Sequence, residues 1–238
     1  MSGGYGWKAR IGQLYPAGGL ADGEPQAMAP EGVLFVTTRI GFARVGLAHA
    51  RGLVADLETP ARLLTDAAVQ LIVFNCTSAS MDVGPEAINR RIEAAAGVPS
   101  TTTIEGVMAA LRATRARRLG LLTPYTPDVV EAETRFLARE GYAVAVTGGE
   151  PCATPVEQGL LSPERWIEWA EPFAGKGLEA LLISCAGIRI APVLQRIEDR
   201  LGIPVVTSNQ AVVWHCLHKL ALPDRPRGFG ALLAGKFD

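Results

Sequence analysis

Short, wholly apolar runs are the clearest feature of the hydrophobic pattern along this chain. Residues 71–74 and 180–183 each place four apolar side chains in a row, and small polar residues and a thiol follow directly. Such runs are typical of strands that are buried on both faces of a parallel sheet. Open parallel sheets bind their ligands beyond the carboxyl ends of the strands. The two thiols that follow, Cys76 and Cys185, therefore lie where a ligand site is expected.

The pattern around the two thiols recurs along the chain. The thiols themselves are 109 residues apart. Residues 10–16 resemble residues 118–124 at an offset of 108, and residues 92–99 resemble residues 197–204 at an offset of 105. Three matches in one order and at nearly one offset predict two related halves. If the halves pack about a pseudo-twofold axis, the two thiols face one cleft from opposite sides.

Amphipathic stretches of helical length separate the apolar runs. The expected strands are 10–15, 32–38, 71–74, 118–123, 142–147, 180–183 and 205–206. The expected helices are 47–68, 85–97, 104–113, 128–139, 163–173, 191–201 and 211–220, with a loop rich in Pro and Gly at 148–159. This alternation predicts an α/β fold of two pseudo-symmetric, doubly wound parallel-sheet halves, with the active site in the cleft between them. We place the first half at 1–115 and the second at 116–238, with the last helices of the first half free to cross over.

Composition narrows the class of protein. The 238 residues are 48% hydrophobic, which is enough for a large core, and the formal net charge is −1. This balance argues against nucleic acid and acidic membrane surfaces as partners. No apolar run has membrane-spanning length, and the first residues show no apolar signal core. We therefore expect a soluble, cytoplasmic protein. The sequence is compatible with a monomer and with a homo-oligomer.

Cysteine and histidine usage bears on metals and cofactors. Four Cys and three His without a C-x-x-C pair predict neither a disulfide scaffold nor a zinc site. The sequence has no phosphate-binding loop of the G-x-G-x-x-G or Walker type. We therefore expect an activity that needs no metal, nucleotide or other cofactor. Of the four thiols, Cys152 and Cys216 are expected to be small buried hydrophobic residues.

Cys76 and Cys185 are the candidate catalytic residues. Backbone N–H groups and a helix N-terminus after each strand favour a thiolate. The segment 16–19, which contains only Pro, Ala and Gly, ends the first strand and permits close approach of a ligand to the backbone. Tyr125 ends the first strand of the second half, and its hydroxyl can donate a hydrogen bond to a substrate carboxylate.

Five segments of the chain resemble one known family: 75–78, 123–125, 184–187, 201–206 and 228–233. The chain is similar to the aspartate/glutamate racemase superfamily, in the branch of the maleate cis-trans isomerases and arylmalonate decarboxylases. The similarity extends over nearly the whole chain, and the paired Cys segments are its most specific part. It implies two similar α/β halves, an active site between them, a small carboxylic acid as substrate, and no metal or organic cofactor.

Within this branch the resemblance implies two activities. Both thiols are a feature of maleate isomerases, whereas arylmalonate decarboxylases keep only the counterpart of Cys185 and have Gly in the place of Cys76. The first strand end, with Pro16, Ala17 and Gly18, is closer to the decarboxylase pattern than to the Asn-containing segment of the isomerases. The thiol pair and the first strand end therefore favour different activities.

The two thiols favour a cofactor-independent isomerase, of the maleate isomerase or racemase type. In such an enzyme the Cys76 thiolate attacks a double bond or removes an α-proton, and Cys185 protonates the opposite face. The substrate-binding residues implied by the resemblance are Pro16, Ala17, Gly18, Asn75, Thr77, Ser78, Tyr125, Ala186 and Gly187. The first alternative is a decarboxylase in which Cys185 protonates the enediolate that remains after CO₂ has left. The second alternative is a two-lobed protein that only binds a small acid.

Overall fold

The apolar runs become central strands of two parallel sheets in the computed structural model of the chain, which describes residues 3–41 and 52–238. The first sheet has the order β2-β1-β3-β4, and the second has the order β6-β5-β7-β8. The strands are β1 (Ala9–Pro16), β2 (Val33–Ile40), β3 (Leu71–Phe74), β4 (Ser100–Thr102), β5 (Arg118–Leu122), β6 (Ala143–Gly148), β7 (Ala180–Ile183) and β8 (Val205–Thr207). The second order repeats the first, which confirms the predicted pair of doubly wound halves.

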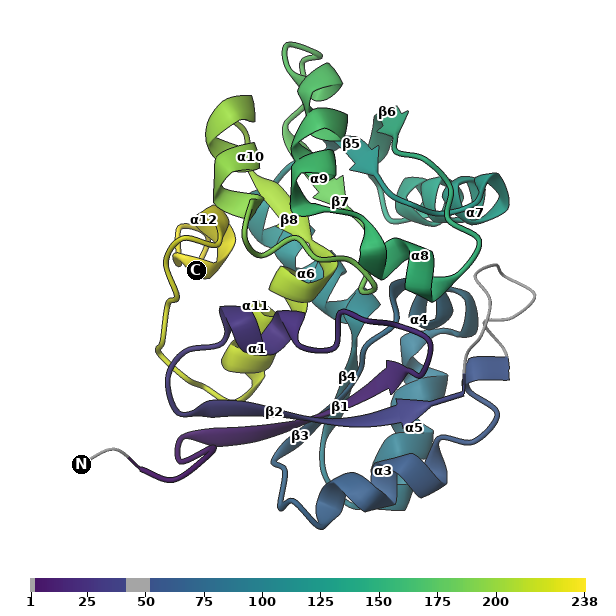
Figure 1. Cartoon of the computed structure of the whole chain (residues 1–238), viewed down its shortest axis with the longest axis vertical. Helices are drawn as coiled ribbons and strands as arrows, with labels where there is room; N and C mark the ends of the chain where they lie inside the picture. The colour runs from purple at the N-terminus through teal and green to yellow at the C-terminus, as the bar shows by residue number, and fades with distance from the viewer. Residues whose placement is uncertain (1–2, 42–51) are drawn as a thin grey trace.

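Helices flank both sheets and also lie between them. The first sheet is accompanied by α1 (Glu24–Met28), α3 (Glu58–Thr65), α4 (Thr77–Val83), α5 (Pro85–Ala96) and α6 (Thr103–Thr114). The second is accompanied by α7 (Pro127–Arg139), α8 (Pro155–Leu160), α9 (Pro163–Ala170), α10 (Leu194–Leu201), α11 (Ser208–Lys219) and α12 (Gly230–Leu233). Figure 1 shows the first sheet in the lower part of the molecule and the second in the upper part, and α6 and α11, which pack against each other, lie between them.

Strand β3 shows why these strands need apolar side chains on both faces. Leu71 and Val73 join a core cluster that extends through the second half of the chain. Ile72 and Phe74 join a second cluster, which includes buried residues of α3 and α5. Full burial of a side chain of this size contributes about 1.5–3 kcal/mol. The run is therefore a strand with two buried faces, as its sequence predicts.

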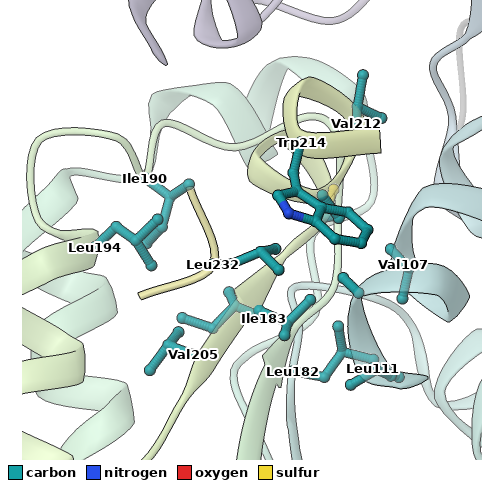
Figure 2. Packing of buried hydrophobic residues seen from close by; sticks show 14 of the residues in the cluster. Val107, Leu111, Leu182, Ile183, Ile190, Leu194, Val205, Val212, Trp214 and Leu232 are labelled. Carbon is teal, nitrogen blue, oxygen red and sulfur yellow. The ribbon is translucent and has the colours of Figure 1, made fainter. Parts of the chain in front are cut away.

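The larger of the two clusters connects the halves. It contains Ile11 of β1 together with residues of α6, the second sheet and α11. Figure 2 shows a part of it, in which side chains of α6, β7, β8 and α11 gather, among them Val107, Leu182, Val205 and Trp214. One continuous apolar core therefore packs against strands of both halves.

The helices α6 and α11 begin with the same capping box. Thr102 accepts a hydrogen bond from the backbone N–H of Glu105, whose side chain accepts one from the N–H of Thr102. Thr207 and Gln210 make the same pair of bonds 105 residues later. The second box extends the sequence repeat to the level of side-chain contacts.

The structure differs from the prediction mainly in short elements. Helix α4 begins directly after Cys76, before the predicted helix start at residue 85. The region 148–159 was predicted to be a loop, which is wrong for its last part, because α8 begins there. Thr154 caps that helix through the N–H of Glu157, and Pro155 occupies its first turn.

Three further findings concern the predicted helix 47–68, the predicted boundary between the halves, and membrane-spanning helices. The predicted helix 47–68 falls partly on residues 42–51, which lie outside the described residues. In its described part, residues 52–53 and α3 are helical, but the prediction of one continuous helix is wrong because residues 54–57 are not helical. The two sheets lie on either side of the predicted boundary at residues 115 and 116, and the assignment of two domains stays a prediction. Among the helices of the described ranges, none is long and apolar enough to cross a membrane.

Candidate active site

Cys76 lies at the junction between β3 and α4. It is the N-cap residue of α4 and has an extended backbone. Its side chain is buried, with its Sγ 3.9 Å from the Oγ of Ser78. Burial raises the pKa of the Cys76 thiol, while hydrogen bonds from Ala79 N–H and from Ser78 act in the opposite direction. The local structure therefore offers the Cys76 sulfur several neutral hydrogen-bond donors.

Cys185 has the equivalent place after β7. The backbone N–H of Gly187 donates to its Sγ at 3.2 Å, and its thiol lies 3.4 Å from the Oε1 of Gln158. Burial raises the pKa of the Cys185 thiol to about 12, although the bonds from Gly187 and from the Tyr125 hydroxyl lower it. The expectation of a thiolate is therefore wrong for Cys185, whose thiol form is favoured in this environment.

The N-terminus of α11 connects the two thiol loops. The Oγ of Ser208 accepts hydrogen bonds from the backbone N–H of Cys185 at 3.1 Å and from the Oγ1 of Thr77 at 2.9 Å. One residue later, Asn209 donates to the carbonyl of Ala186 and accepts from Asn75. The loops after β3 and β7 are therefore held in one hydrogen-bonded arrangement although they are far apart in the sequence.

Both thiols line the same cavity, which has a volume of about 30 Å³. It is lined by Tyr15, Pro16, Gly19, Asn75, Cys76, Thr77, Ser78, Tyr125, Gln158, Cys185, Ala186 and Gly187. Of the candidate residues named from the sequence, only Ala17 and Gly18 are not in its wall. Residues from both sequence halves thus meet at one cavity.

Three of the predicted site residues, Ala17, Gly18 and Asn75, do not offer a free side chain to the cavity. Ala17 is exposed and Gly18 is half-buried beside the wall. Asn75 is fully buried, and its amide donates to Gln13 and Asn209 and accepts from Thr103. Because these partners use its hydrogen-bonding groups, the Asn75 side chain positions the strand end behind the cavity.

Three residues of the wall are absent from the sequence-based candidates. Tyr15 donates to the carbonyl of Ala186 at 3.3 Å and so bridges the halves. Gly19 leaves room for that ring, since a Cβ there would lie 2.5 Å from it. Gln158 reaches the cavity from α8, and its buried Nε2 has no hydrogen-bond partner among the described residues. Tyr15 could have been identified from the sequence, because it directly precedes the candidate residue Pro16. Nothing in the sequence pattern singles out Gln158.

The wall carries polar groups but no charged side chain. Among the described residues that line the cavity there is no Lys, Arg, His, Asp or Glu. A substrate carboxylate would have to be held by hydroxyl, amide and backbone N–H groups, which act strongly on charge inside a low-dielectric site. In the ranges 3–41 and 52–238, no three His, Cys, Asp or Glu side chains are grouped so that they could hold a metal ion.

The candidate site can be compared with known proteins. A family model described as arylmalonate decarboxylase matches residues 11–233. An arylmalonate decarboxylase from Bordetella bronchiseptica is 28% identical over 233 residues, which cover 93% of this chain and 95% of that protein. A maleate isomerase from Nocardia farcinica (strain IFM 10152) is 27% identical over 209 residues, which cover 84% of this chain and 83% of that protein.

A solved structure has the same fold as this chain. A Nocardia farcinica maleate cis-trans isomerase, in which one Cys is replaced by Ser, carries a covalently bound succinylcysteine intermediate. It matches this chain with a TM-score of 0.87 at 24% identity and covers 95% of this chain and 98% of that one. The chain therefore belongs to the arylmalonate decarboxylase family, and it is an enzyme whose relatives include both a decarboxylase and maleate isomerases.

Proposed function

We propose that the protein is a cofactor-independent isomerase of a small carboxylic acid, in which Cys76 and Cys185 act from opposite sides of the substrate. One observation carries the proposal: thiols from both halves of the chain line one cavity. A decarboxylation needs one proton donor, whereas cis-trans isomerisation through an adduct needs a nucleophile as well. A second thiol in the wall is therefore explained by isomerisation and is superfluous for loss of CO₂.

The cavity supports a small, aliphatic acid as the substrate. Its small volume of about 30 Å³ favours a compact four-carbon acid over an acid that carries an aryl substituent. The first strand end lacks the amide that the isomerase pattern has there, and Gln158 supplies an amide from α8 instead. We therefore favour an unsaturated dicarboxylic acid of the maleate type, with Gln158 as one carboxylate ligand.

The first chemical step is addition of the Cys76 thiolate to one carbon of the double bond. A new S–C bond forms, and the π electron pair moves to the adjacent carbon and its carboxylate as an enediolate. Thr77, Ser78 and Tyr125 are the hydroxyl donors in the wall that can stabilise this charge. Transfer of the Cys185 proton to the enediolate carbon gives a succinyl thioether on Cys76.

The second step reverses the first after a rotation. The former double bond is now single, so its two ends turn relative to each other. The Cys185 thiolate takes the proton back, the double bond forms again as the trans isomer, and the Cys76 thiolate leaves with the electron pair of the S–C bond. No atom or electron is gained or lost overall. The succinylcysteine in the Nocardia farcinica enzyme is an adduct of the same kind.

The direct test is a product screen by NMR in D₂O with maleate, aryl malonates and amino acids, followed by single substitutions. Cys76→Ser and Cys185→Ser are each expected to lower turnover by about 100-fold or more, the scale for loss of a nucleophile or of a general acid. Cys152→Ser is the matched control, because that thiol is also buried but does not line the cavity.

The screen separates the alternatives. If Cys76→Ser retains nearly full activity, Cys185→Ser is inactive and CO₂ is lost, the protein is a decarboxylase and the isomerase proposal is wrong. If amino acids exchange their α-proton with solvent and maleate is unchanged, the two thiols act as base and acid of a racemase. If neither substitution matters, the chemistry does not involve these thiols at all.

A further inference from the structure

Glu133 is a carboxyl group enclosed in the protein behind the Cys185 loop. It lies on α7 with 1% of its surface exposed. Its Oε1 accepts a hydrogen bond of 2.5 Å from the Oγ of Ser184, the residue before Cys185. Its Oε2 is buried, and no described residue forms a hydrogen bond or an ion pair with it. A buried carboxyl with so few partners is costly, and the proposed chemistry does not otherwise use it.

In the first half, the residue before the thiol contacts no carboxyl group among the described residues, whereas Ser184 contacts Glu133. The residue before Cys76 is Asn75, whose amide is held by the neutral side chains of Gln13, Thr103 and Asn209. Cys76 therefore lies among neutral groups, whereas Cys185 has a carboxyl behind it. The two thiols have pseudo-symmetric places but different electrostatic surroundings.

We propose that Glu133 is a positioning residue whose negative charge adds to the effect of burial in keeping Cys185 protonated, so that Cys185 acts as the acid and Cys76 as the nucleophile. The two catalytic roles in this statement rest on the proposed function. The electrostatic part does not, because a negative charge behind a thiol opposes its ionisation whatever the substrate is. Glu133 acts through Ser184 and Cys185 and does not line the cavity.

Other titratable groups also face Cys185. Besides Glu133 on α7, they are Tyr125 after β5, Cys76 after β3 and Tyr15 on β1. Burial raises the pKa of Glu133 to about 7, while the bond from Ser184 lowers it. The Glu133 carboxyl is therefore mostly neutral below about pH 7 and mostly charged above it. Cys185 becomes harder to ionise as Glu133 loses its proton.

The test measures the rate at which iodoacetamide alkylates each thiol, by mass spectrometry of the separate peptides, from about pH 5 to about pH 10. The thiolate sulfur forms the S–C bond and iodide leaves, so the rate follows the ionised fraction. In the natural protein the Cys185 rate is expected to rise in two steps, with a flatter region near pH 7. Glu133→Gln should give one step and about tenfold faster labelling of Cys185 in alkaline solution, the effect of about one pH unit.

The rate at Cys76 is the internal reference for access of the reagent, and it should change by less than about threefold. Glu131→Gln is the matched control, because Glu131 is exposed on the same helix and paired with Arg135. An unchanged Cys185 rate in Glu133→Gln would overturn the proposal. So would a single-step profile in the natural protein, a measurement that stands even if the variant does not fold. Neither needs a substrate, so either failure leaves the proposed function untouched.

Discussion

At the scale of single residues, Gln158 is the polar side chain that enters the cavity without complete hydrogen bonding. Its Oε1 faces the Cys185 thiol, while its Nε2 is buried and has no partner among the described residues. A buried amide donor without an acceptor costs about 1–3 kcal/mol. A substrate carboxylate in the cavity would remove this cost, because it would accept the free N–H. An unpaired buried amide of this kind is typical of a ligand-binding site.

We therefore expect Gln158→Leu to weaken substrate binding. A hydrogen bond to a charged group contributes about 1.5–3 kcal/mol, so KM should rise by about 10- to 100-fold with a smaller change in kcat. Steady-state kinetics with the acid identified by the product screen measures both. Leu160→Ala, on the exposed face of the same helix, is the control. An unchanged KM in Gln158→Leu would mean that the amide does not contact the substrate.

The sequence identified the thiols of this site but not the Gln158 amide. Cys76 and Cys185 follow four-residue apolar runs, and the period of the repeat sets them opposite each other. Gln158 lies in a Pro- and Gly-rich stretch whose hydrophobic pattern has no clear period. Its helix has only six residues and depends on one cap and one Pro, so tertiary contacts determine its place.

At the scale of elements, the first turn of α11 organises both thiol loops. Ser208 bonds to Thr77 of the first half and to the N–H of Cys185 of the second. The preceding residue, Thr207, caps the helix and fixes the direction in which this turn leaves β8. The position of Ser208 therefore depends on a capping box that is remote from the reacting atoms.

Loss of this cap should lower the stability of the protein. Thr207→Ala is expected to cost about 1 kcal/mol of unfolding free energy and to lower Tm by about 2–4 °C, because the N–H of Gln210 loses its acceptor. Thr102→Ala, the equivalent change in α6, should cost about as much. Thermal unfolding followed by circular dichroism measures both variants. Equal stability of Thr207→Ala and the natural protein would contradict the role of the cap.

The strength of the local hydrophobic pattern decided which parts of the fold were predictable. Strands β3 and β7 are continuous apolar runs, and α7 has a full amphipathic pattern, so their patterns are strong. Strand β4 consists of Ser100, Thr101 and Thr102, which resemble a helix cap more than a strand. It forms because β3 offers it a pairing edge, which is a tertiary effect that no local pattern contains.

At the scale of the whole molecule, specific contacts between the halves define the cavity. Glu24 of α1 accepts hydrogen bonds from the backbone N–H groups of Ile190 and Ala191 in the second half, both through its Oε2. Tyr15 adds a bond to the carbonyl of Ala186. The sequence repeat predicts that two halves face each other, but it does not predict these bonds, because neither residue has a counterpart in the other half that makes the same contact.

The bond pair at Glu24 gives a prediction about how firmly the halves are held together. In Glu24→Ala both N–H groups remain buried without an acceptor, and each is expected to cost about 1–3 kcal/mol of unfolding free energy. Glu24→Gln retains an oxygen that can accept both bonds, so it should lose much less. Urea unfolding of the two variants beside the natural protein measures the difference. If both variants lost the same free energy, the carboxylate charge would matter more than the two bonds. Turnover should follow the same order, since the segment that Glu24 holds comes directly after the Cys185 loop and one wall of the cavity moves with it.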